Sequence, residues 1–197
     1  MFNQKRVETG VPGLDLLLEG GFFKRNLILL AGATGTGKSI FSSQFIYNGY
    51  TRYNEKGVYV TLEEDAIAIK RNMRSFGFDF EKVEQEGAVR ILDLMAFKNE
   101  EMFSNNIELI LSAVNEVKAE RLVIDSVTAF LSVFSDRAEY RLNMHLIYKM
   151  LKNLGCTTIM TCSMPIGTKN IGLGIEESIA DSLILLENVT EGIELKT

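Results

Sequence analysis

Residues 32–39 read Gly-Ala-Thr-Gly-Thr-Gly-Lys-Ser, and this stretch, GATGTGKS, decides the fold. It has the spacing G-x-x-x-x-G-K-[S/T] of a phosphate-binding loop, the P-loop. Its glycines let the backbone turn tightly, so that successive N–H groups point at phosphate oxygens. In this pattern Lys38 reaches the β- and γ-phosphates, and the Ser39 hydroxyl is a ligand of Mg²⁺. A helix that begins here adds the positive end of its dipole.

The sequence on either side of this loop supports the interpretation. Residues 26–31, NLILLA, form a short apolar run that is typical of a buried parallel strand. Residues 40–53, IFSSQFIYNGYTRY, predict a helix with Phe45 and Ile46 on one face. A Gly-rich turn that binds nothing would leave Lys38 and three glycines unexplained. The predicted nucleotide-contacting residues are Gly32, Ala33, Thr34, Gly35, Thr36, Gly37, Lys38, Ser39 and Ile40.

Length and composition indicate a single globular domain over residues 1–197, with 46% hydrophobic and 24% charged residues. No apolar run approaches the roughly 18 residues of a membrane span, and the N-terminus lacks the apolar stretch of a signal peptide. A net charge of −5 does not suit a general nucleic-acid binder. Cys156 and Cys162 lie too far apart along one predicted strand to pair, and nothing indicates an oxidising compartment. We therefore expect a cytoplasmic protein without a membrane partner.

Short apolar runs alternate with amphipathic stretches along the chain. Further strands are predicted at 58–62, 89–95, 121–125, 156–162 and 182–187, with helices at 65–76, 100–119 and 137–154. This alternation predicts an α/β fold, with a mostly parallel central sheet and helices on both faces. A turn at 190–192 then leads to a strand that begins at Ile193, which indicates a C-terminal β-hairpin that the end of the chain truncates.

Leucine-rich patterns predict how two of the helical segments pack. Residues 14–18 are expected to form a short helix packed on the core, ended by two glycines. In the predicted helix 137–154, the expected inward residues are Leu142, Leu146, Met150 and Leu151.

Three acidic residues, Glu63, Glu64 and Asp65, follow the predicted strand 58–62. One interpretation makes Asp65 the cap of the next helix, with both glutamates solvated at its N-terminus. The other places a carboxylate at the edge of the sheet where ligands of α/β proteins bind. There it would orient and deprotonate a water molecule that attacks the γ-phosphate. The residues alone leave both interpretations open.

The apolar strand at 121–125, RLVID, ends in Asp125, which is the form of a Walker B element. An aspartate after a strand is weak evidence alone, because Asp begins many turns and caps. With a P-loop in the same chain, Asp125 is predicted to hold Mg²⁺ through water, opposite Ser39. Thr161 and Ser163, at the end of another strand, either contact the γ-phosphate or are ordinary strand-end polar residues.

Taken in order, these blocks resemble the KaiC-type ATPases of the RecA superfamily, over nearly all residues from 7 to 197. The matching stretches are VETGVPGLDLLLEGGFFKRN, GATGTGKS, VYVTLEED, RNMRSFGFDFEKVEQEGAVRILD, RLVIDSVTAF, LKNLGCTTIMT and GIEESIADSLILLENV. The resemblance implies a RecA-like P-loop NTPase fold, with ATP and Mg²⁺ bound between the subunits of a ring, commonly a hexamer. It also implies that Glu63 and Glu64 are catalytic together with Lys38, and that Glu63 is the general base.

Two departures from the family limit what the resemblance assigns. The loop at 163–174 lacks the charged residues that the family has after this strand, so it is assigned no partner-sensing role. The chain ends before the strand in which the family carries a Lys-x-Arg pair directed at the neighbour's phosphate. Since one such donor is worth roughly 10³-fold in rate, slow turnover is expected.

The function expected from these observations is Mg-ATP binding and slow hydrolysis by a ring-forming regulatory ATPase, with a protein partner left open. The alternatives are an autokinase of KaiC type, a RecA- or RadA-like DNA-recombination ATPase, and a nucleotide-binding switch with negligible hydrolysis. Loops that would contact DNA, at 134–138 and 163–174, contain one arginine and one lysine between them. That is little charge to neutralise phosphates, so binding to nucleic acid is not expected.

Overall fold

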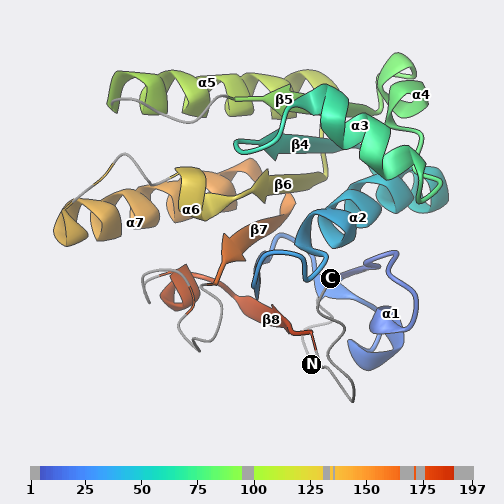
Figure 1. Ribbon diagram of the computed structural model, residues 1–197, viewed down its shortest axis with the longest axis horizontal. Coiled ribbons are helices and arrows are strands. Elements are labelled where there is room, and N and C mark those ends of the chain that lie inside the picture. Colours follow the sequence, from blue (N-terminus) through green and yellow to red (C-terminus); the bar gives the residue numbers. More distant parts are fainter. Residues whose placement is uncertain are drawn as a thin grey trace, which may run out of the picture.

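A sheet of six parallel strands forms the centre of the computed structural model (Figure 1). Its order is β5-β4-β6-β7-β3-β8, and each neighbouring pair is parallel. The strands are β3 (Leu27–Gly32), β4 (Gly57–Thr61), β5 (Val89–Asp93), β6 (Arg121–Asp125), β7 (Thr157–Ser163) and β8 (Ser182–Leu186). A separate antiparallel pair joins β1 (Arg6–Val7) to β2 (Phe22–Phe23). The structure describes residues 5–94, 100–130, 134, 136–164, 171 and 176–188.

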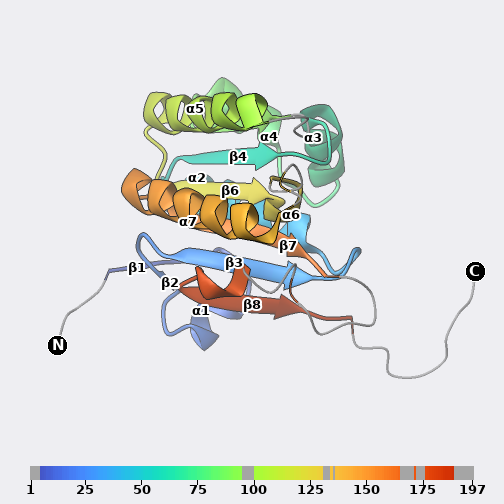
Figure 2. The same ribbon diagram turned by 90° about the vertical axis from the view of Figure 1, so that its left-hand side faces the viewer.

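Helices cover both faces of this sheet, which gives three layers (Figures 1 and 2). One face carries α2 (Lys38–Tyr53), α3 (Ala66–Arg74) and α4 (Phe80–Gln85), and the other carries α5 (Glu100–Val117), α6 (Val127–Phe130) and α7 (Arg137–Leu154). Alternate residues of β3 divide between two cores: Leu29 packs with the α5 and α7 side, whereas Leu30 packs with the α2 side. Because both of their faces are buried, the central strands β3, β4 and β6 are mostly apolar, whereas the edge strands β5 and β8 are partly exposed. The predicted α/β fold with a parallel sheet is confirmed.

The last described strand of the sheet is β8, and residues 187 and 188 follow it without regular secondary structure. The hairpin partner predicted to begin at Ile193 lies outside the described residues. Within the described parts of the chain, no helix has the length and hydropathy needed to cross a bilayer.

The inward face of α7 agrees only in part with the predicted one: Leu151 is buried and Met150 packs against the core, but two of the predicted leucines are exposed. Leu142 is 61% exposed and Leu146 is 53% exposed. The residues of α7 that are buried against the sheet are Tyr140, Met144, Ile147 and Leu151. Their spacing of three or four residues follows one side of a helix, and Leu142 lies between two of them on the opposite side. The prediction assigned the most apolar side chains to the inner face of α7, whereas the face that packs on the sheet also contains Tyr140.

The leucine-rich segment that contains the short helix α1 (Leu14–Leu17) was predicted to pack on the core, and it does so only in part: Leu18 packs against the α2-side core, whereas Leu16 is 85% exposed and Leu17 is 80% exposed. Polar contacts also hold this segment. The Asp15 carboxylate accepts hydrogen bonds from the backbone N–H of Thr9 at 2.6 Å and of Gly10 at 3.3 Å. A single turn of helix can therefore form here without burying its leucines.

Cys156 and Cys162 are both buried as free thiols beside the α5 and α7 side of the sheet. Burial raises the pKa of Cys156 to about 12 and the pKa of Cys162 to about 11. Both thiols therefore stay protonated at neutral pH and behave as small apolar side chains.

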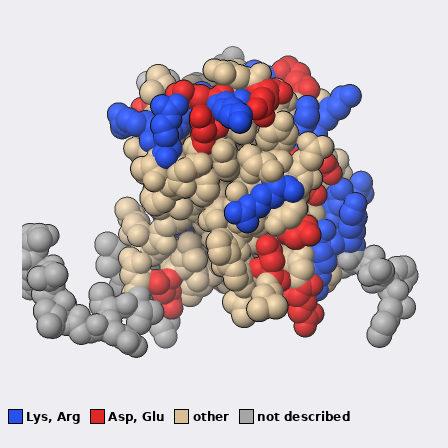
Figure 3. Space-filling model, turned by 90° about the vertical axis from the view of Figure 1, so that its right-hand side faces the viewer, with Lys and Arg blue, Asp and Glu red and all other residues tan. Residues whose placement is uncertain are grey.

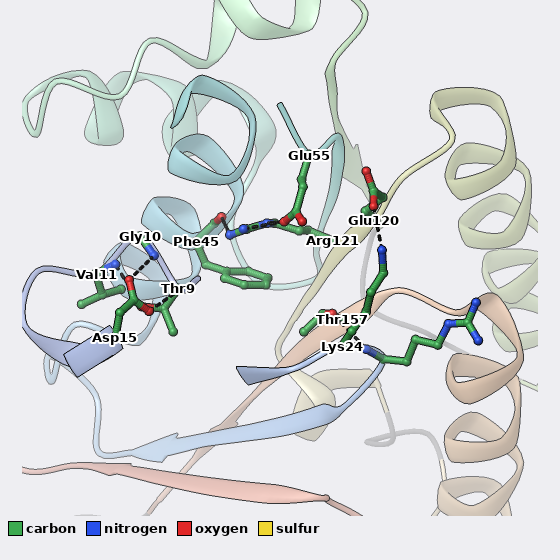
Figure 4. Close-up of polar contacts among 11 residues, drawn as sticks. Thr9, Gly10, Val11, Asp15, Lys24, Phe45, Glu55, Glu120, Arg121 and Thr157 are labelled. Atoms are coloured by element: carbon green, nitrogen blue, oxygen red, sulfur yellow. Dashed lines mark hydrogen bonds and ion pairs between the residues drawn. The ribbon is translucent and has the colours of Figure 1, made fainter. Parts of the chain in front are cut away.

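A buried arginine joins α2 to the start of β6, at the edge of the sheet opposite the P-loop (Figure 4). Arg121 donates through Nε and Nη2 to Glu55 Oε2 at 2.8 Å and 2.6 Å, and through Nη1 to the Phe45 carbonyl at 2.9 Å. Its guanidinium also lies over the Phe45 ring, 4.5 Å from the centroid. Burial lowers the pKa of Arg121, and the Glu55 carboxylate opposes this shift. The Glu55 carboxylate therefore makes the main contribution that keeps this charge inside the protein.

Removing that carboxylate is expected to destabilise the fold strongly. Glu55→Ala should lower the free energy of unfolding by about 3 kcal/mol, because it leaves the buried guanidinium without its counter-charge. Glu116→Ala is the matched control, since Glu116 pairs with Arg90 where both side chains are about half exposed. That loss should be much smaller, because water and salt screen an exposed ion pair. Urea denaturation measures both values, and equal losses would contradict the role given to Arg121.

Candidate nucleotide site

The loop between β3 and α2 has the conformation that its sequence predicts. Gly35 has φ 83° and Gly37 has φ 93°, in the left-handed region that glycine adopts without strain. Gly37 precedes the first residue of α2, so the helix begins at Lys38, two residues before the predicted start. The Thr36 hydroxyl donates to the Ala33 carbonyl at 2.8 Å and closes the inner turn. The loop therefore ends with the first N–H groups of a 16-residue helix, which is a favourable place for an anion.

Lys38 lies across this loop. Its Nζ donates to the Gly32 carbonyl at 2.8 Å and to the Ala33 carbonyl at 3.0 Å. The charged group thus stays beside the loop that is predicted to hold phosphates.

A cavity of about 290 Å³ opens at this point. Its lining residues are Thr34, Gly35, Gly37, Lys38, Ser39, Ile40, Glu63 and Ser163. Six of these belong to the predicted nucleotide-contacting set, whereas Gly32, Ala33 and Thr36 form the inner turn behind it. Glu63 and Ser163 come from the ends of other strands, so the carboxyl ends of β4 and β7 meet the P-loop at one cavity.

The three acidic residues after β4 have three different surroundings. Glu63 lines the cavity, and its Oε1 accepts a hydrogen bond from the Ser126 hydroxyl at 2.7 Å. Asp65 is the N-cap of α3 and accepts from the backbone N–H of Ala68 at 2.7 Å. Glu64 is not among the described lining residues, and its carboxylate accepts from Asn72 of α3 at 2.7 Å. The helix-cap interpretation thus fits Asp65, and the interpretation as a carboxylate at the ligand-binding edge fits Glu63. The catalytic roles of Glu63 and Glu64 stay predictions.

Asp125, at the end of β6, is held through both of its carboxylate oxygens. Oδ2 accepts from the Tyr59 hydroxyl at 2.6 Å, and Oδ1 accepts from the Thr161 hydroxyl at 2.5 Å. Tyr59 is fully buried, and this burial together with Asp125 raises its pKa well above the ordinary value. The nearby Ser43 and Ser39 hydroxyls oppose part of this rise in the pKa of Tyr59. The phenol therefore bonds to the predicted metal ligand Asp125 and lies near the other one, Ser39.

Sequence reasoning missed Tyr59 and Ser126, and left the role of Thr161 open. Strand register contained the signal for two of them. Ile124 pairs with Met160, so the next residues along, Asp125 and Thr161, lie side by side on the α2 face of the sheet. Thr61 pairs with Asp125, and Tyr59 lies two residues earlier on that same face. Alternation along neighbouring strands would have identified both hydroxyls once the strand order was known.

The oxygen donors at this site suit a magnesium ion. Ser39 offers a hydroxyl and Asp125 a carboxylate, and Mg²⁺ prefers hard oxygen ligands. Among the described residues, no group of three or more His, Cys, Asp or Glu side chains could hold a metal ion. That agrees with the way Mg²⁺ binds at nucleotide sites, where one or two protein oxygens combine with phosphates and water. The residues present therefore fit Mg²⁺ bound together with a nucleotide.

Comparison with known proteins identifies the family. A sequence model described as "ATPase: KaiC" matches residues 7–196. The chain belongs to the KaiC family of ATPases. This KaiC-family chain is 38% identical over 197 residues to a UPF0273 protein of Methanocaldococcus jannaschii, with 93% of this chain and 80% of that protein covered. It is 36% identical over 193 residues to the circadian clock protein KaiC3 of Synechocystis sp., with 94% of this chain but 38% of that protein covered.

A solved structure supports the same assignment. The crystal structure of a KaiC-like protein from Pyrococcus horikoshii has a TM-score of 0.83 and 42% identity, over 92% of this chain and 80% of that one. The predicted KaiC-like, RecA-type fold is thereby confirmed. As a member of this family, the protein is an ATP-binding ATPase.

Proposed function

We propose that this KaiC-family ATPase binds ATP together with Mg²⁺ in the cavity at the P-loop, and hydrolyses it slowly as a ring-forming regulatory protein. The observation that carries the proposal is the meeting of Lys38, Ser39 and Glu63 at one cavity. Asp125 supports it, because its carboxylate accepts a hydrogen bond from Tyr59, whose phenol lies near Ser39. A cation, a metal ligand and a carboxylate base are the parts that phosphoryl transfer to water needs.

In the proposed mechanism the residues position groups and stabilise charge. The P-loop N–H groups and Lys38 hold the β- and γ-phosphates, while Ser39 and Asp125 hold the metal. Mg²⁺, when bound, supplies positive charge next to the β- and γ-phosphate oxygens. Glu63 orients and deprotonates the attacking water, and the Ser126 hydroxyl, 2.7 Å away, orients Glu63. The rate gained comes from positioning and from charge stabilisation.

Charge on the surface supports a regulatory ATPase over a DNA-recombination ATPase. On the face shown in Figure 3, acidic side chains lie among and beside the basic ones. On α3 and α4, Lys70 pairs with Glu84 and Arg74 pairs with Glu81. Positive charges neutralised in this way are poorly available to DNA phosphates. Of the two loops predicted to contact DNA, 163–174 lies largely outside the described residues, whereas 134–138 is described except for residue 135.

Self-association into a ring, commonly a hexamer in this family, is the proposed assembly, with ATP at the subunit interface. Light scattering with and without Mg-ATP tests it: we expect the mass to rise to several times that of the 22.1 kDa chain when Mg-ATP is added. Exposed apolar residues such as Leu16 and Leu17 offer surface that a neighbouring subunit would cover. A mass that stays at that of a single chain in the presence of Mg-ATP would contradict ring formation.

A cytoplasmic location is proposed together with this assembly.

Hydrolysis is tested separately by phosphate release from the same protein. The expected result is slow release of phosphate that depends on Mg-ATP. Rapid turnover would contradict slow hydrolysis. Incorporation of labelled phosphate into the protein, detected by mass spectrometry, would favour the autokinase alternative instead.

A further inference from the structure

We propose that Tyr59 is a positioning residue for the metal: its buried hydroxyl fixes the orientation of the Asp125 carboxylate, so that Asp125 can bind Mg²⁺ together with the nucleotide. The inference rests on the proposed binding of Mg-ATP at this cavity. It concerns a residue of β4 that belongs neither to the P-loop nor to the Walker B strand.

Asp125 lies on a strand whose two neighbours both supply a donor to it. In the sheet, β6 lies between β4 and β7. Tyr59 of β4 donates to one carboxylate oxygen and Thr161 of β7 donates to the other. The carboxylate plane is therefore fixed from both sides, because any rotation about the side chain breaks at least one of these hydrogen bonds.

Tyr59 provides this contact because the nearer residue is engaged elsewhere. Thr61 is the register partner of Asp125 on β4, but its hydroxyl donates to the Glu64 carbonyl at 2.5 Å. Tyr59 lies two residues before Thr61, and its longer side chain reaches forward along the same face to Asp125. The β4 side of the carboxylate is thus held by the phenol.

The surroundings of the phenol make this contact costly to replace. Tyr59 has no exposed surface, so bulk water has no access to the hydroxyl. A buried donor that loses its acceptor carries the full cost of desolvation. The Tyr59 hydroxyl bonds to Asp125, and the Ser39 hydroxyl of the P-loop lies close enough to influence the pKa of the phenol. The contact thus lies near both predicted metal ligands.

The two donors leave the carboxylate free to serve a metal. A carboxylate has about four acceptor sites, and these two hydrogen bonds occupy two of them. Groups that orient a metal ligand in this way, without touching the metal, typically contribute 10- to 100-fold to metal affinity. Tyr59 is thus expected to act on Mg²⁺ and to leave the direct contacts between the P-loop and the nucleotide unchanged.

The test is a Mg²⁺ titration of Tyr59→Phe, which removes the hydroxyl and keeps the ring. Binding of a fluorescent ATP analogue is measured against Mg²⁺ concentration, and again in EDTA without metal. We expect the Mg²⁺ concentration at half-saturation to rise about tenfold, while affinity in EDTA stays unchanged. Tyr47→Phe is the matched control, since Tyr47 packs against Phe78 and Phe80 within the same apolar cluster as Tyr59. It should leave both measurements at the wild-type values.

Each other outcome decides against the inference. An unchanged Mg²⁺ half-saturation in Tyr59→Phe overturns it, and so does an equal loss of affinity with and without metal, which would mean a general effect on the cavity. If Tyr59→Phe shows no cooperative thermal melt, Thr161→Val removes the second hydrogen bond that orients Asp125, the one from β7. The Mg²⁺ concentration at half-saturation should then also rise about tenfold. The wild-type protein tests the proposed function separately. If it binds the analogue equally with and without Mg²⁺, the proposed binding of Mg-ATP fails. If its binding depends on Mg²⁺ and Tyr59→Phe behaves identically, only the inference about Tyr59 fails.

Discussion

Replacing Lys38 by Ala is expected to abolish ATP turnover and to weaken ATP binding by about 100-fold or more. Lys38 lines the cavity, and its ammonium group lies within hydrogen-bond distance of two P-loop carbonyls. In a P-loop the same group reaches the β- and γ-phosphates, where negative charge is concentrated in the ground state and in the transition state. The variant therefore loses ground-state binding and transition-state stabilisation together.

Equilibrium binding of ATP and phosphate release measure the two losses. Lys24→Ala is the matched control, because Lys24 pairs with Glu120 at 3.0 Å near the opposite edge of the sheet (Figure 4). It removes the same charge from the protein and should leave binding and turnover unchanged. A cooperative melt of Lys38→Ala would show that the fold survives the loss of the two carbonyl contacts. Full activity in a folded Lys38→Ala protein would contradict the proposed site.

Local signals allowed the general architecture to be predicted from the sequence. The P-loop motif is contiguous, and its glycines are required by positive φ angles at Gly35 and Gly37. Strands buried on both faces give continuous apolar runs, so residues such as 121–125 were recognised without knowledge of their neighbours. The helix at 137–154 was predicted with the bounds that the structure has, because Gly155 ends it in a left-handed conformation.

Features that depend on the order of strands could not be predicted from one sequence. The contact of Tyr59 with Asp125 needs β4 beside β6, and the contact of Thr161 needs β7 on its other side. Burial of Arg121 likewise depends on Glu55, which is 66 residues away in sequence. Apolar periodicity predicted the wrong face where one helix has apolar residues on two sides. Leu142 of α7 was therefore predicted to be buried, although it is exposed to solvent. Local periodicity gives the element, and tertiary contacts choose the face.

Glu63→Gln is expected to retain ATP binding and to lose turnover by about 10²- to 10⁴-fold, the range typical of a general base. The amide oxygen of Gln can still accept the hydrogen bond that Ser126 donates to Glu63 at 2.7 Å. The variant therefore keeps the shape of the cavity and the orientation of the side chain, and it removes the group that accepts a proton from water. Phosphate release, with binding of ATP measured in parallel, separates these two effects.

Glu64→Gln is the informative comparison, because it makes the same chemical change at the adjacent residue. The Glu64 carboxylate accepts from Asn72 on α3 and lies outside the described lining of the cavity, so its effect on turnover should be much smaller. A larger loss in Glu64→Gln than in Glu63→Gln would reverse the assignment of the base. Equal and complete losses would mean that the two glutamates act as a unit, with Glu64 holding the segment that carries Glu63. Unchanged turnover in Glu63→Gln would leave the cavity as a nucleotide-binding site without its own base, since Glu63 is the carboxylate that the structure places in its lining.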